Sequence, residues 1–127
     1  MDIKNQFNNL IKDLKKLNND VSKDCIDYIE EIISSCGRYV ERVTATEAAF
    51  TIARFRMEPE AYREYVTELD RSRKIAHDTV MVNIAILNRY CRLVGVQPIY
   101  TGDLNDRITV ADFAMRVCNT FFKNRKL

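Results

Sequence analysis

The sequence predicts an all-α fold, a compact bundle of five to six mostly antiparallel helices. Apolar residues recur at spacings of three and four along most of the chain, which is the helical period. Only three glycines and two prolines interrupt the chain, and no stretch alternates apolar and polar residues as a strand would. With 127 residues, 46% of them apolar, the chain has the size and composition of one domain spanning residues 1–127.

The N-terminal region predicts two helices. The first 17 residues place five apolar side chains on one helix face: Ile3, Phe7, Leu10, Leu14 and Leu17. A turn is expected at Asn18–Asp20, after which Ser22 caps a second helix and Gly37 ends it. We therefore expect a helical hairpin over residues 1–37, packed on a core formed by residues 38–127.

The central region allows two interpretations. Thr44 and Glu47 have capping-box spacing, and Pro59 fits the first turn of the next helix. From Pro59 to Val94 there is no further glycine or proline. The segment is either one helix about 54 Å long, which would project beyond a compact domain, or two helices with a break near Asp70–Arg73. We favour the break, because helices above about 30 residues are uncommon in domains of this size.

The C-terminal region predicts a long loop and a final helix. Gly95 ends the preceding segment, and residues 96–108 show little periodicity. Loops of this length often carry function. Thr109 and Asp112 have capping-box spacing, and an apolar helical stripe follows: Val110, Phe113, Val117 and Phe121.

Charge and cysteine content exclude several classes of protein. The 20 basic and 18 acidic residues are interspersed, so charge does not indicate a nucleic-acid partner. A membrane-spanning helix needs about 20 apolar residues, and no apolar run is nearly that long. No signal peptide is visible either, so we expect a cytoplasmic protein without a membrane partner. One histidine and cysteines without CxxC spacing predict no metal, no cofactor and buried thiols: Cys25, Cys36, Cys91 and Cys118.

His77 is the only histidine, and its neighbourhood resembles a known motif. The His77-Asp78 pair suggests an HD-type phosphohydrolase, but one histidine cannot hold the metal ions of that chemistry. Arg71, five intervening residues and His77 resemble the Arg-x(4–6)-His motif of HEPN domains, with polar Ser72 first among the five. The resemblance implies a metal-independent ribonuclease, in which His77 is the general acid/base and Arg71 stabilises charge on the scissile phosphate.

A structural role for His77 is the favoured alternative. In a continuous helix, Arg73 and His77 are neighbours one turn apart, and a half-exposed histidine there needs no catalytic role. Arg71 lies about 120° from His77 around a regular helix. The HEPN-like interpretation therefore requires a helix break near residue 70 or a second chain.

Asn83 is expected to point into an apolar sector of its helix. A buried amide without partners costs about 1–3 kcal/mol, so we expect a polar cross-link between helices. The alternative is a ligand pocket with Thr79, Asn83 and Tyr90 as its polar lining. A cleft that joined this lining to the long loop would add three further candidate residues: Tyr100, Asp103 and Arg107.

A second resemblance rests on three segments in the C-terminal half: Arg71–Asp78, Leu87–Arg89 and Ile99–Asp103, together with Arg107. They resemble small uncharacterised helical proteins of Gram-positive bacteria and their mobile elements. The resemblance implies a bacterial helical protein and no particular activity. We expect a non-enzymatic protein that acts through protein–protein contact, as a homodimer or an accessory subunit. The HEPN-like ribonuclease is the alternative, and a DNA-binding helical regulator comes third.

Overall fold

The computed structural model describes residues 2–99 and 102–122, and these residues form four helices and no strand. The helices are α1 (Ile3–Leu17), α2 (Asp20–Ala53), α3 (Pro59–Val94) and α4 (Arg107–Phe121). The all-α expectation is confirmed. The expected number of helices is wrong, because two of the predicted breaks lie inside continuous helices.

Helix α2 begins with a capping box and runs past both of its expected ends. The Asn19 side chain accepts from the Ser22 amide, and the Ser22 hydroxyl accepts from the Asn19 amide, so the cap is Asn19 and not Ser22. The helix continues through Gly37, which costs about 1 kcal/mol in a helix interior but is buried in the packed part of α2. The Thr44 hydroxyl donates to the Val40 carbonyl instead of capping a new helix. The expected boundary after residue 37 therefore falls within α2.

Helix α3 is one element of 36 residues, so the expected break near Asp70–Arg73 is wrong. Pro59 occupies the first turn, and Gly95 ends the helix with a φ of 77°. At the expected break, the Arg73 guanidinium lies 3.3 Å from the Asp70 carboxylate, an exposed pair one turn apart that a regular helix accommodates. On either side of this pair, apolar Leu69 and Ala76 are half-buried.

Helix α4 begins two residues before its expected cap. Its N-cap is Asp106, whose carboxylate accepts from the Ile108 amide at 3.0 Å, whereas Thr109 lies within the first turn. The Thr109 hydroxyl also donates to the Asp106 carboxylate. The expected apolar stripe is confirmed, since Val110, Phe113 and Val117 are buried.

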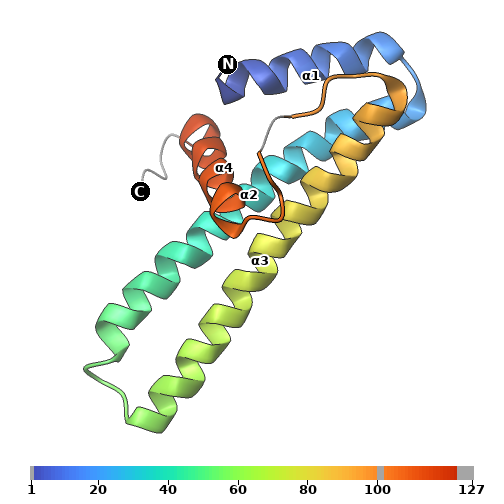
Figure 1. Cartoon of the computed structure of the whole chain (residues 1–127). Coiled ribbons are helices and arrows are strands. Elements are labelled where there is room, and N and C mark those ends of the chain that lie inside the picture. Colours follow the sequence, from blue (N-terminus) through green and yellow to red (C-terminus); the bar gives the residue numbers. More distant parts are fainter. Residues whose placement is uncertain (1, 100–101, 123–127) are drawn as a thin grey trace.

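Helices α2 and α3 form a long antiparallel pair, and α1 and α4 pack on one part of it (Figure 1). The backbone of α3 approaches those of α2 and α4 most closely. The other end of the pair, residues 44–74, extends beyond α1 and α4 in Figure 1, and we call this segment the arm. None of the helices within the described residues has the length and apolar character needed to cross a membrane.

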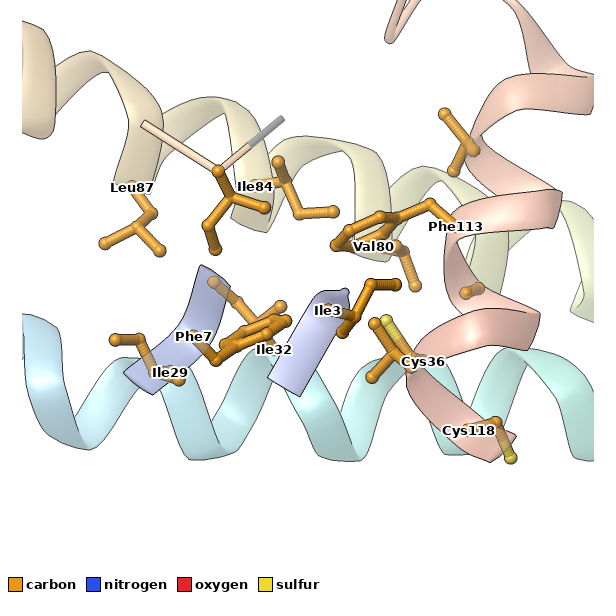
Figure 2. Packing of buried hydrophobic residues seen from close by; sticks show 14 of the residues in the cluster. Ile3, Phe7, Ile29, Ile32, Cys36, Val80, Ile84, Leu87, Phe113 and Cys118 are labelled. Carbon is orange, nitrogen blue, oxygen red and sulfur yellow. The ribbon is translucent and has the colours of Figure 1, made fainter. Parts of the chain in front are cut away.

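The core fills the space where all four helices meet. Side chains of α2 and α3 point toward one another in Figure 2, and Phe7 of α1 and Phe113 of α4 complete the cluster. The Phe7 and Phe113 rings stack with centroids 6.5 Å apart. Core residues of the central pair that are less than 2% exposed include Ile29, Ile32, Cys36, Val80, Ile84, Leu87 and Cys91.

Candidate interaction surface

His77 lies in the core and not at the surface. The residue is 5% exposed, so the expected half-exposed position is wrong. Its ring packs edge-on against Tyr39 of α2, with centroids 5.6 Å apart, and Nδ1 lies 3.1 Å from the Asp78 carboxylate. Nε2 is buried without a hydrogen-bond partner among the described residues. A substrate phosphate could not reach this nitrogen without a change in packing.

The two arginines considered with His77 lie elsewhere. Arg71 is exposed and pairs with Glu68 at 2.7 Å, and Arg73 pairs with Asp70. Arg71 lines a groove between α2 and α3, whereas His77 packs against Tyr39 in the core. Within one chain, the structure does not bring Arg71 and His77 together.

Asn83 links the two long helices. The Tyr28 hydroxyl of α2 donates to the Asn83 Oδ1 atom of α3 at 2.6 Å. Partial burial raises the pKa of Tyr28, and the neighbouring Glu31 carboxylate raises it further, so the phenol remains a donor at neutral pH. The hydroxyl of exposed Thr79 donates to the Ile75 carbonyl in its own helix, while Tyr90 is half-buried against the core.

The candidate residues of the long loop are not joined to this link. Asp103 is exposed and its carboxylate accepts from the Asn105 amide at 2.9 Å, and exposed Arg107 is the first residue of α4. Tyr100 lies outside the described residues. Within the part of the chain that the structure describes, no hydrogen bond or ion pair connects Asp103 or Arg107 with Asn83.

Sequence reasoning missed the role of Asn88. This buried side chain accepts from the Ile99 amide and donates to the Ile99 carbonyl, both at 3.1 Å. It fastens the start of the loop to α3. Its position on the same face as His77, Ile84 and Cys91 was a usable signal, because all three are also buried.

A cleft of about 740 Å³ lies between α1, residues 97–98 and α4. Leu10 and Phe113 form part of its apolar wall. The basic side chains at its edge, Lys12, Lys16 and Arg116, are all exposed, and Arg116 pairs with Asp112. Because this cleft contains no buried charged group, its lining does not select one class of ligand.

The outward side of α3 is unusually apolar. Ile75, Val82, Ile86 and Leu93 are 61%, 47%, 56% and 76% exposed. They recur at spacings of seven, four and seven, so they share one helix face. The core side chains of α3, such as Val80, Ile84 and Cys91, occupy the opposite face, on which α4 packs.

Helix α2 contributes charged residues to the same side of the pair. A groove of about 310 Å³ is lined by Arg38 and Arg42 of α2 together with Ile75 and Thr79 of α3. Glu31 pairs with Arg38 at 2.6 Å, and exposed Asp24 and Asp27 precede Glu31 at helical spacing. We call this side the open face. Its residues are Asp24, Asp27, Glu31, Arg38 and Arg42 of α2 and Tyr65, Ser72, Ile75, Thr79, Val82, Ile86 and Leu93 of α3.

Comparison with known proteins adds a family and no activity. Among residues 2–99 and 102–122, no three or more histidine, cysteine or acidic side chains are grouped to hold a metal ion. A search of the curated proteins found no match for this chain. The model of a family described as "protein of unknown function (DUF3232)" matches residues 2–127. The chain therefore belongs to this uncharacterised family.

Proposed function

We propose that this protein acts without catalysis, through protein–protein contact made by the open face. The observation that carries the proposal is the row of exposed apolar side chains along α3: Ile75, Val82, Ile86 and Leu93. Large exposed apolar patches on a folded chain commonly mark sites of protein or ligand contact. A homodimer and an accessory subunit of a larger assembly are both forms of this function.

The energy available at this face is large enough for specific association. Complete burial of one large aliphatic side chain is favourable by about 1.5–3 kcal/mol. The four exposed side chains together offer several kcal/mol, from which the cost of association is subtracted. The charged residues of α2 beside them supply specificity in place of additional apolar area.

The HEPN-like ribonuclease has less support, because Arg71 lines the groove between α2 and α3 while His77 is buried against Tyr39. It would require a second chain to bring the two side chains together. An RNA-cleavage assay of the wild type and His77→Ala decides this point, since equal cleavage in both removes His77 from the chemistry. A DNA-binding role, the third candidate, would show steeply salt-dependent binding.

The proposal is tested by a charge placed at the centre of the apolar row. Ile86→Glu is compared with Ile108→Glu, since Ile108 is 78% exposed at the start of α4, away from the open face. Tagged wild type and both variants are produced in the native cells, and the proteins that co-purify are identified, including untagged copies of this chain. Binding is then measured with purified components.

We expect Ile86→Glu to lose the partner that the wild type and Ile108→Glu retain, because the new carboxylate would be buried without a partner. Circular dichroism and thermal unfolding are the checks that both variants are folded. If Ile86→Glu retains every interaction of the wild type with unchanged affinity, the open face is not the contact surface.

A further inference from the structure

We infer that the partner of the open face is a second copy of this chain, packed antiparallel, with α2 on α2 and α3 on α3. This inference rests on the proposed function and specifies its partner. The two central pairs would form a four-helix bundle in which every neighbouring helix is antiparallel. Three features of the open face favour this arrangement.

The first feature is the spacing of the α3 residues about Thr79. Ile75 and Val82 lie four residues before and three residues after Thr79. Ser72 and Ile86 lie seven residues on either side of it, and Tyr65 and Leu93 lie fourteen residues on either side. When two such helices run antiparallel with Thr79 facing Thr79, Tyr65 of one copy is level with Leu93 of the other, and Ile75 lies within one residue of the level of Val82. Every exposed aliphatic side chain of the row then faces an apolar or small side chain.

The second feature is the charge sequence of α2. On the open face, Asp24, Asp27 and Glu31 come first, and Arg38 and Arg42 follow. An antiparallel copy centred between Glu31 and Arg38 places the acidic half of one α2 against the basic half of the other. Complementary charges of this kind favour association and fix the register.

The third feature is that the two centres coincide. The centre of the α2 charge pattern lies at Ser34 and Ser35, and the centre of the α3 row is Thr79. Ser35 and Thr79 line the same groove between α2 and α3. One two-fold axis in the interface plane, crossing both helices at this level, therefore satisfies both patterns. A self-complementary patch related by a two-fold axis is the commonest form of dimer interface.

The size of the face is sufficient for a stable dimer. Helices of this length are about 50 Å long, and a pair with axes about 10 Å apart is about 20 Å wide. The area of the face is thus about 1,000 Å² per chain. A standard interface buries about 800 Å² on each partner, so the face is large enough. A two-fold axis along the helices would instead place α2 on α3 of the partner. The charges of Asp24, Asp27 and Glu31 would then be buried against aliphatic side chains, which is costly.

Disulfide cross-linking distinguishes the two arrangements in the full-length protein. The background carries Cys25→Ala, because Cys25 is the one cysteine that is not fully buried. Thr79→Cys is expected to form a covalent dimer under mild oxidation. Leu93→Cys is expected to cross-link with Tyr65→Cys in a mixture and not with itself. Ile108→Cys, outside the open face, is the control and is expected to remain uncrosslinked.

A reversal of charge provides a second test that does not depend on oxidation. Arg38→Glu/Arg42→Glu and Asp27→Lys/Glu31→Lys are each expected to weaken self-association about tenfold or more, since like charges then face each other. Mixing the two variants is expected to restore the wild-type affinity in a heterodimer. Circular dichroism is the check that each variant remains folded.

Three outcomes overturn the inference. Cross-linking of Ser34→Cys with Thr79→Cys, without a Thr79→Cys homodimer, would show that α2 packs on α3 of the partner. If both charge-reversed variants self-associate as strongly as the wild type, the acidic half of one α2 does not face the basic half of the other. A wild-type protein that sediments as a strict monomer at high micromolar concentration would exclude the second copy as the partner. The proposed function would then be tested separately, by the co-purification of Ile86→Glu and Ile108→Glu.

Discussion

The carboxamide of Asn88 bonds both backbone groups of Ile99, with N···O distances of 3.1 Å in each direction. Both residues are buried, so water cannot replace these bonds. The pair fixes the chain at the point where it leaves α3 and turns toward α4. One side chain of α3 thus satisfies the two polar groups of a buried loop residue, as buried backbone requires.

Replacement of Asn88 by alanine is expected to lower the free energy of unfolding by about 2–4 kcal/mol, because two buried backbone groups lose their partners at once. Urea unfolding followed by circular dichroism measures the change. Asn105→Ala is the matched control, since Asn105 is exposed, and its effect should stay within about 0.5 kcal/mol. Equal losses in the two variants would contradict the role of Asn88.

The Tyr28–Asn83 hydrogen bond is suited to a double-mutant cycle. Tyr28→Phe removes the donor and leaves the half-buried Asn83 carbonyl without it, which should cost about 1 kcal/mol. Asn83→Leu removes the acceptor, and the double variant should be less destabilised than the sum of the single variants. A coupling energy near zero in urea unfolding would show that the bond contributes nothing to stability.

Gly95 ends α3 in the left-handed region, with a φ of 77°. No atom lies within 4 Å of a Cβ built there, so the cost of a side chain is conformational and not steric crowding. We expect Gly95→Ala to lower the free energy of unfolding by about 1 kcal/mol and Gly95→Asn to lower it less, because asparagine tolerates this region. Thermal unfolding of the two variants checks the order, and a more stable alanine variant would contradict it.

Burial raises the pKa of the Cys36 thiol to about 12, and the nearby Cys118 contributes in the same direction. At pH 8 the thiol is almost wholly protonated and is therefore unreactive. We expect iodoacetamide to label half-buried Cys25 first and Cys36 only after unfolding, as read by mass spectrometry. In guanidinium chloride all four cysteines should react alike, and native labelling of Cys36 at the rate of Cys25 would contradict the assignment.

The same shift has a consequence for stability. The pKa of an unperturbed cysteine is 9.0, and burial in the folded chain raises the pKa of Cys36 to about 12. A group whose pKa is raised on folding stabilises the protein below its unfolded pKa, and this stabilisation is lost as the pH rises toward the folded value. Cys36 therefore contributes to a loss of stability between pH 9.0 and about 12.

The sequence predicted the helical class and several element ends for sound physical reasons. The apolar face of α1, Pro59 at the start of α3 and Gly95 at its end all follow from local geometry and appear as expected. The helix end predicted at Gly37 and the helix start predicted at Thr44 are wrong. Each prediction rested on a local preference of the residue for a helix terminus, which is worth about 1 kcal/mol. Tertiary packing along a 34-residue helix exceeds such a preference.

The candidate site was less accessible to sequence reasoning. His77 attracted attention as a single histidine, yet its ring packs against Tyr39 in the core. The open face could not be recognised, because Ile75 and Val82 look like core residues until the position of α4 is known. Periodicity shows that a helix has an apolar side, but in α3 two sides are apolar, and only the packing decides which one is covered.

The arm has a consequence for how the molecule opens. Beyond α1 and α4, the two helices of the arm pack only on each other in Figure 1. Thr46 and Ala53 are buried there, but larger side chains such as Phe50, Tyr62 and Val66 are only half-buried. Amide protons of the arm should therefore exchange with deuterium sooner than those near Ile32 and Ile84, through local separation that leaves the base intact. In a single chain the covered end is therefore the last part to open.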